Sequence, residues 1–281
     1  MRIFIIATVL VSNSAMAFVS GPSSVNAGEQ YLSIGTQAER GKVEPNENKA
    51  SFQSAQIDIY KLKYVRGLES LPGLSTSNVY FEYGSFSSAQ EQVGSTLFYE
   101  KDQGSYLTLG FSGDIVHEPD RQLGLYVQLS PGRTYNKNKF SNPRLDLFAL
   151  GLTSAFNVTD NLFQRNLIHY GSGDSPSQNS YLAVDTGFGY RLNHLAGRQF
   201  TVMGSLFFEA DSNERTDASY DAAFSPTGTQ DRIRAFKYGT LLGMDVAITN
   251  KVNLNINYLQ KLGGYDARST QVYTANIGYK F

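Results

Sequence analysis

Hydrophobic and polar residues alternate without interruption along the last eleven residues of the chain, 271–281. One face of this segment is apolar or aromatic and consists of Tyr273, Ala275, Ile277, Tyr279 and Phe281. The other face is mostly small or polar and consists of Val272, Thr274, Asn276, Gly278 and Lys280. A period of two residues is typical of a β-strand that separates an apolar from a polar environment. The pattern therefore predicts a strand that runs to the last residue.

The same alternation recurs upstream, with turn residues between the alternating segments. Leu125 and Val127, for example, alternate with Gly124, Tyr126 and Gln128. Residues 249–251 are short enough to join the two segments beside them as a hairpin. The predicted strands are residues 29–38, 51–65, 78–87, 104–116, 121–130, 144–158, 161–170, 180–192, 198–210, 232–248, 252–262 and 270–281. They number twelve, and single-chain bacterial barrels have an even number of strands.

Composition places these strands in a membrane. Charged residues make up 17% of the 281 residues, against about 25% in soluble domains. After residue 17, no apolar stretch approaches the roughly 20 residues that a transmembrane helix needs. Because every backbone polar group must be paired in lipid, strands can cross a bilayer only as a closed barrel. The predicted fold is therefore all-β, a closed antiparallel transmembrane β-barrel.

The N-terminus has the three-part layout of a secretory signal peptide. Met1 and Arg2 give a positive start, residues 3–11 are apolar, and Ala15-Met16-Ala17 is a small-x-small cleavage pattern. Cleavage would leave Phe18 as the first residue and residues 18–281 as a single barrel domain. The alternative is a buried N-terminal strand or helix.

Several classes of function are excluded by composition. The chain has no Cys, which excludes a disulfide framework, a Cys nucleophile and thiolate metal sites. Removal of residues 1–17, whose one charge is Arg2, leaves 23 basic and 25 acidic residues and a net charge of −2. Nucleic-acid binding would require a basic face, so no nucleic-acid partner is predicted.

The chain end resembles the C-terminal assembly signal of Gram-negative outer-membrane β-barrel proteins, porins among them, without matching one specific family. The residues that carry the resemblance are Tyr273, Ile277, Tyr279 and the final Phe281. The resemblance implies the cell outer membrane as location, outer-membrane lipids and lipopolysaccharide as surroundings, and the barrel-assembly machinery as a partner. The alternative is an edge strand of a soluble β-sandwich that happens to end at Phe281.

In that class the last strand ends in the periplasm, which assigns every connection to one side. The outer connections would be residues 39–50, 88–103, 131–143, 171–179, 211–231 and 263–269. The periplasmic ones would be residues 117–120, 159–160, 193–197 and 249–251, with 66–77 as a longer exception. Long loops on one side and tight turns on the other are expected of such barrels.

Two predicted strands fit the alternation poorly. In 51–65 the apolar positions change face between Ile59 and Tyr60, which a β-bulge would explain. Residues 161–170 place polar side chains such as Gln164 and His169 on both faces. Ten or fourteen strands therefore remain open at this point.

Charged residues on the polar faces are the candidates for the lumen of the barrel. The acidic candidates are Asp58, Glu82, Asp114, Asp185 and Asp245, and the basic ones are Lys61, Lys63, Arg191, Lys237, Lys261 and Lys280. This near balance gives no lining of one sign that would select anions or cations. The charges would either pair with one another or guide a substrate.

A catalytic or metal site is not predicted. A resemblance to known outer-membrane lipid hydrolases would require a His with a Ser two residues later on one strand. Two residues after His117, His169 and His194, this chain has Pro119, Gly171 and Ala196. Residues 173–176, Gly-Asp-Ser-Pro, are similar to the nucleophile segment of a soluble esterase family, yet no α/β scaffold surrounds them. Three scattered histidines give no metal-ligand spacing. No cofactor is predicted.

Two further groups have a simple structural interpretation. Loop 211–231 carries acidic residues that could attract cations but match no defined ion loop, namely Asp211, Glu214, Asp217, Asp221 and Asp231. Aromatic residues near strand ends are expected in the girdles at the membrane interfaces, namely Tyr190, Tyr258, Tyr279 and Phe281.

These features favour a porin-like barrel whose lumen is a narrow channel for small polar solutes. Eight strands leave a filled interior and about sixteen an open channel, so twelve does not decide whether the lumen conducts. The second hypothesis is a closed structural barrel that acts through its outer loops. The third hypothesis is an enzyme that acts on lipid or lipopolysaccharide, but the chain lacks the catalytic arrangement of residues that such an enzyme would need. The solute and the oligomeric state stay open.

Overall fold

The computed structural model describes residues 25–42, 52–92, 98–134, 146–172, 180–195, 198–211, 236–265 and 269–281. The strands in this part of the chain are β1 (Gln30–Lys42), β2 (Phe52–Leu68), β3 (Thr76–Gln92), β4 (Phe98–His117), β5 (Arg121–Thr134), β6 (Phe148–Asn157), β7 (Leu162–Ser172), β8 (Tyr181–Leu195), β9 (Arg198–Asp211), β10 (Phe236–Ala247), β11 (Val252–Tyr265) and β12 (Ser269–Lys280). Each of the twelve predicted strands corresponds to one of these.

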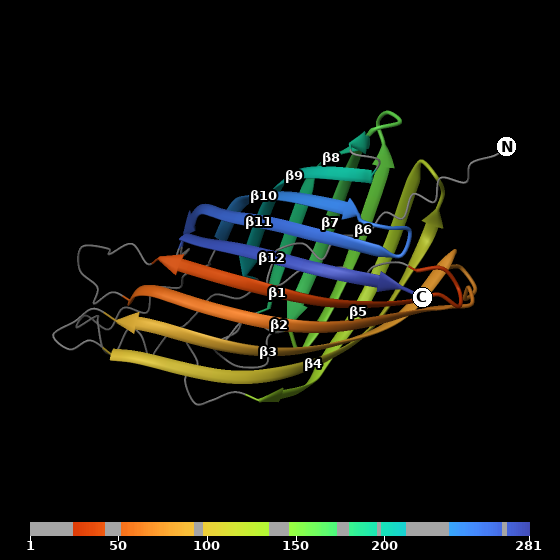
Figure 1. Cartoon of the computed structure of the whole chain (residues 1–281). Helices are drawn as coiled ribbons and strands as arrows, with labels where there is room; N and C mark the ends of the chain where they lie inside the picture. The colour runs from red at the N-terminus through yellow and green to blue at the C-terminus, as the bar shows by residue number, and fades with distance from the viewer. Residues whose placement is uncertain are drawn as a thin grey trace.

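The sheet is a closed barrel (Figure 1). Every strand pairs antiparallel with its neighbours in sequence, and β1 pairs with β12 from Tyr31–Lys280 to Lys42–Ser269. The prediction of a closed, twelve-stranded, antiparallel all-β barrel is confirmed. In the part of the chain that the structure describes, no helix is long and apolar enough to cross a membrane.

The two ends of the barrel differ. The end that holds both barrel termini, called the termini end below, has short connections, among them residues 118–120, 158–161 and 248–251. The connection between β2 and β3 is longer and includes Gly73. Its φ of +82° is in the left-handed region, which glycine adopts more readily than other residues. At the opposite end, the loop end, β3 and β4 extend into the predicted loop 88–103, up to Gln92 and from Phe98.

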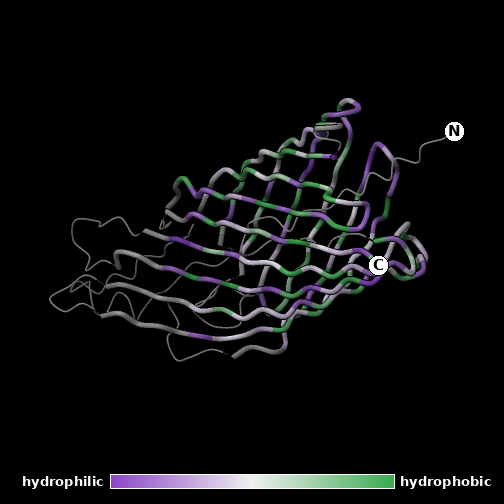
Figure 2. The backbone as a smooth tube through the Cα atoms, in the orientation of Figure 1, coloured by the Kyte–Doolittle hydropathy of each residue, from purple (hydrophilic) through white to green (hydrophobic). Residues whose placement is uncertain are grey.

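The outer face of the barrel is apolar. Ile34, Leu129 and Leu206 are exposed, as are Ile277 and Tyr279 on the last strand, where Ile277 keeps 50% of its surface accessible. Figure 2 shows hydrophobic and hydrophilic residues in alternation along the strands. A closed barrel with such an outer surface is stable only where lipid covers it, so the chain is a transmembrane barrel.

Large rings on the inner face lie flat along the wall. The ring of Tyr80 lies over Gly110 of the next strand, where a Cβ atom would meet it at 2.0 Å. Tyr181 covers Gly171 in the same way, at 2.3 Å. Such aromatic–glycine pairs pin the register of neighbouring strands. They also explain why glycines occur at inward positions of a membrane barrel.

The bulge predicted in the second strand is wrong. β2 pairs with β1 without interruption from Ser54 to Arg66, and its one irregularity against β3 lies at the strand end, between Phe52 and Ser54. Ile59 does not change face: it points inward and packs with Phe86 and Tyr106. The apparent phase slip arose because this strand has apolar side chains on both faces.

The expectation for Asp58 is corrected by the same alternation. Asp58 lies between two inward residues and shares the outer face with Tyr60, which is exposed. Its Oδ1 atom is 2.7 Å from Nη2 of Arg40 on the outer face of β1. The pair lies toward the loop end of both strands, where charged side chains can reach water.

Candidate functional site

The inner wall encloses a cavity of about 200 Å³ at the termini end. Inward residues of β6 to β12 line much of it, together with residues 249–253 of the last tight turn. The chain before β1 reaches its mouth, where the backbone N–H of the buried Val25 donates to Oδ1 of Asn78, 3.0 Å away. The cavity therefore forms a vestibule on the side of the termini.

Charged side chains in the vestibule make ion pairs, hydrogen bonds or cation–π contacts with neighbouring residues. Arg165 Nη2 lies 3.2 Å from Oδ2 of Asp185, which is 0% exposed. The guanidinium of Arg191 lies 4.6 Å from the centre of the Phe163 ring and donates to Asn157 Oδ1 at 3.0 Å. Such contacts fix the direction of each charge, so the vestibule has an ordered polar surface.

An ion pair at the rim closes the seam between the first and last strands. Lys280 Nζ lies 2.6 Å from Oε1 of Glu29, just before β1. Partial burial alone would raise the pKa of Glu29, but hydrogen bonds from Lys280 and from Asn26 outweigh it and hold this pKa below its ordinary value. The rim carboxylate is therefore ionised at neutral pH.

Polar side chains of β1, β2 and β3 form one side of the lumen beyond the vestibule. We call this set the charged wall, and it consists of Gln37, Glu39, Lys61, Lys63 and Glu82. Lys61 Nζ donates to Gln37 Oε1 at 2.7 Å, and Gln37 Nε2 donates to Glu39 Oε1 at 2.8 Å. Lys63 pairs in register with Glu82, which accepts a 2.8 Å hydrogen bond from Tyr106.

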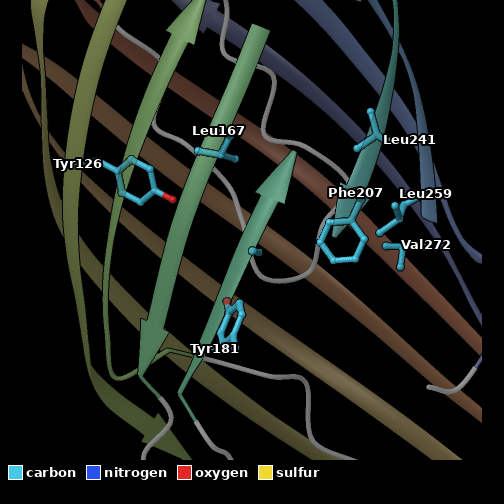
Figure 3. Packing of buried hydrophobic residues seen from close by; sticks show 8 residues of the cluster. Tyr126, Leu167, Tyr181, Phe207, Leu241, Leu259 and Val272 are labelled. Atoms are coloured by element: carbon cyan, nitrogen blue, oxygen red, sulfur yellow. The ribbon is translucent and has the colours of Figure 1, made fainter. Parts of the chain in front are cut away.

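Apolar side chains of β7 to β12 form the other side. We call this set the apolar wall, and it consists of Leu167, Ala183, Phe207, Leu241, Leu259 and Val272. All six are at most 2% exposed and belong to one cluster with Tyr126 and Tyr181 (Figure 3). Glu209 and Lys261 follow Phe207 and Leu259 toward the loop end and are also buried. The lumen is thus amphipathic in cross-section.

A buried polar cluster joins β5, β7 and β8 beside the apolar wall. The Tyr126 hydroxyl lies 2.5 Å from Nδ1 of His169, whose Nε2 lies 3.1 Å from Asp146 Oδ2 and 2.9 Å from the Tyr181 hydroxyl. Tyr181 also donates to Asp146 Oδ2 at 3.0 Å. His169 is fully buried, so this cluster stabilises the wall and is not accessible to a substrate.

The structure places the sequence candidates for the lumen as follows. Residues on the inner face are Lys61, Lys63, Glu82, Asp114, Asp185, Arg191, Asp245, Lys261 and Lys280. Most occupy two groups, the charged wall and the vestibule. Asp114 binds His117 at the tight turn after β4, with 2.8 Å between Oδ2 and Nδ1. Asp58 lies outside, and the side chain of Lys237 is not among those described.

Sequence reasoning missed four buried inward charges, Glu39, Asp146, Arg165 and Glu209. Glu39 fell in a predicted loop, although β1 continues to Lys42. Arg165 lies in the strand whose alternation was obscured by polar residues on both faces. Glu209 could have been found, because it continues the inward series of Met203 and Phe207.

Other candidates lie outside the described residues. They are the signal peptide 1–17 with its cleavage point at Phe18, the segment 173–176, the His194 side chain, and Glu214, Asp217, Asp221 and Asp231 of the acidic loop. Across the described ranges, no three His, Cys, Asp or Glu side chains come together as a potential metal site.

No known protein-family model and no curated protein sequence matches the chain. Solved structures do match its fold. An outer membrane channel from Pseudomonas putida has 13% identity and a TM-score of 0.64, over 94% of this chain and all of that one. The transport unit of the autotransporter AIDA-I from Escherichia coli has 10% identity and a TM-score of 0.56, over 95% of both chains. The monoaromatic hydrocarbon channel CymD has 9% identity and a TM-score of 0.52, over 98% of both chains. The chain therefore has the fold of Gram-negative outer-membrane β-barrels.

Proposed function

We propose that this protein is an integral outer-membrane channel for small solutes that combine an apolar body with a polar or charged group. The observation that carries the proposal is the pairing of a charged wall with an apolar wall across one lumen. A barrel that serves only hydrophilic solutes needs a polar lining throughout. Here Phe207, Leu241 and Leu259 form one packed apolar cluster on the inner face of the same barrel.

The energetics of passage favour such solutes. A solute that passes between the two walls would lose much of its water, and burial of its apolar atoms returns about 25 cal/mol per Å². Its polar group needs new partners, because an unpaired polar group in a dry site costs several kcal/mol. The charged wall can supply them through Lys61, Lys63 and Glu82. A wholly hydrophilic solute would lose hydration on the apolar side without compensation.

The comparisons support a transport role in general terms. Two of the similar structures are described as channels, and one of them, CymD, is described as a monoaromatic hydrocarbon channel. With this role, the termini end would face the periplasm and the loop end the lipopolysaccharide. Lipids of the outer membrane would cover the apolar belt, and the assembly machinery would recognise Phe281 after export through the signal peptide 1–17.

Proteoliposomes test the proposal at neutral pH with two matched pairs of solutes, in which both members of a pair carry the same single charge. Benzenesulfonate is compared with gluconate, and trimethylphenylammonium with choline, so that each pair differs in the apolar ring and keeps its charge. We expect faster protein-dependent influx of the aromatic member in both pairs. Equal influx within each pair would reject the amphipathic solute class. No influx of any solute would favour the second candidate, a closed structural barrel, which the buried polar cluster around His169 also fits.

A further inference from the structure

A row of polar side chains crosses the lipid-facing surface of β6, β7 and β8. Ser154, Asn166 and Thr186 are neighbours in register and lie on the outer face. Asn166 Nδ2 donates to Ser154 Oγ at 3.1 Å, and its Oδ1 accepts hydrogen bonds from Thr186 Oγ1 at 2.6 Å and from Gln164 Nε2 at 3.2 Å. We call Ser154, Gln164, Asn166 and Thr186 the amide row.

The amide row lies within the apolar belt. β7 has 11 residues, about the 9–11 that a tilted strand needs to cross a bilayer, and Asn166 is near its middle. Leu152 and Ile168 flank the row toward the loop end and are 48% and 45% exposed. Phe156 and Phe188 flank it toward the termini end and are also exposed. Hydrocarbon therefore surrounds this position in a lone barrel.

Lipid tails cannot satisfy the remaining hydrogen-bonding groups of the amide row. Among the described residues, the three bonds leave the Gln164 carbonyl oxygen and one N–H of each amide without a protein partner. Such groups cost free energy in hydrocarbon.

A second outer amide cluster, formed by Gln260 and Gln271, gives a useful contrast. It hydrogen-bonds to Tyr258 and Tyr273, with 2.6 Å between Tyr258 Oη and Gln260 Oε1. It lies toward the loop ends of β11 and β12, where tyrosines mark a membrane interface and water is within reach.

We infer that the amide row is the centre of a contact with a second copy of this chain. Amide side chains both donate and accept, so two copies of Gln164 and Asn166 related by a twofold axis can satisfy one another. Twofold dimers are the commonest homo-oligomers, and their interfaces are self-complementary. Polar side chains hold membrane-spanning segments together in the same manner. The exposed apolar residues around the row supply a dry rim for the contact.

The natural absence of cysteine makes a direct test possible. Asn166→Cys places one thiol in the amide row, and Ala275→Cys places one on the outer face of β12, in the last strand's apolar belt. Outer-membrane fractions are oxidised with copper phenanthroline and separated without reducing agent. We expect a covalent dimer for Asn166→Cys and monomer for Ala275→Cys. Thr186→Cys serves as a second probe if Asn166→Cys loses heat-modifiable gel mobility, the sign of a folded barrel.

Three results would overturn the inference. Folded Asn166→Cys and Thr186→Cys could both remain monomeric, or Ala275→Cys could form as much dimer as they do. An adduct with the mass of a different protein would assign the row to another partner. As an independent readout, the double variant Gln164→Leu/Asn166→Leu is expected to give a monomer by light scattering in mild detergent where the wild-type protein gives a dimer. The matched variant Gln271→Leu should keep the dimer.

Discussion

The two walls of the lumen are built from the same strand geometry but different chemistry. On β1 to β3 the inward positions hold a chain of hydrogen bonds, from Lys61 through Gln37 to Glu39. On β9 to β11 the inward positions hold Phe207, Leu241 and Leu259 in van der Waals contact. Lipid fixes only the outer face of a membrane barrel, so the inner face is free to differ from one side to the other. The difference between the walls is the feature on which the proposed function rests.

The largest expected effect comes from breaking the charged wall. Lys63→Met removes the buried cation beside Glu82 and leaves that carboxylate with the Tyr106 hydroxyl. Removing one partner of a buried charge pair typically costs about 3–5 kcal/mol, and urea titration of refolded protein measures the loss. Lys61→Met is the matched control, because it removes only a hydrogen bond from an ammonium group to the neutral amide of Gln37, at a cost of about 1.5–3 kcal/mol. Equal losses for both variants would mean that Lys63 and Glu82 do not act as a pair.

A smaller loss is expected from the apolar wall. Leu259→Ala leaves a cavity beside Val272 and should destabilise the barrel by about 2–3 kcal/mol, at the lower end for Leu→Ala because a lumen can relax. Leu242→Ala is the control, since Leu242 faces lipid and is 59% exposed. In the same titration it should cost less than half as much. A larger cost for Leu242→Ala would reverse the assignment of inside and outside on these strands.

The smallest effect is expected at the rim, which belongs to neither wall. Lys280→Met removes the partly exposed pair with Glu29 and should cost about 0–1 kcal/mol at neutral pH. Because the pKa of Glu29 lies below its ordinary 4.5 in the fold, the pair contributes above that pH, and the contribution is lost as the pH falls through the lowered pKa. The stability difference between Lys280→Met and wild type should therefore vanish in acid. A difference that grows in acid would contradict the pairing.

The outer face could be predicted from the sequence because side chains that contact lipid are almost all apolar. The alternation of Tyr273, Ile277 and Tyr279, like that of Leu125 and Val127, identified the strands and the phase of most of them, and it favoured twelve strands while ten or fourteen stayed open. Strand ends were less predictable. β1, β3, β4 and β5 continue past their predicted ends on the loop side, where outer residues beyond the hydrophobic belt no longer need to be apolar.

The inner face was less predictable because inward side chains can either be polar or pack together as an apolar cluster. Inward positions were expected to be polar, so Ile59 was interpreted as a bulge signal and Leu259 was not recognised as part of a wall. The cluster of His169 with Asp146 joins residues 23 positions apart, across a connection between strands. No local spacing reveals such a contact. The amide row had a trace in the sequence, since Gln164 and Asn166 disturbed the alternation of residues 161–170.

Single-channel recording in planar lipid bilayers tests the central claim most directly, because it asks whether the two walls bound a passage. The account predicts small conductance steps for wild-type protein, larger steps for Phe207→Ala, which widens the apolar wall, and unchanged steps for the lipid-facing Leu242→Ala. Heat-modifiable mobility of each sample shows that the barrel is folded. Bilayers that stay silent with folded wild type and folded Phe207→Ala would contradict the account, and the lumen would then be a closed core.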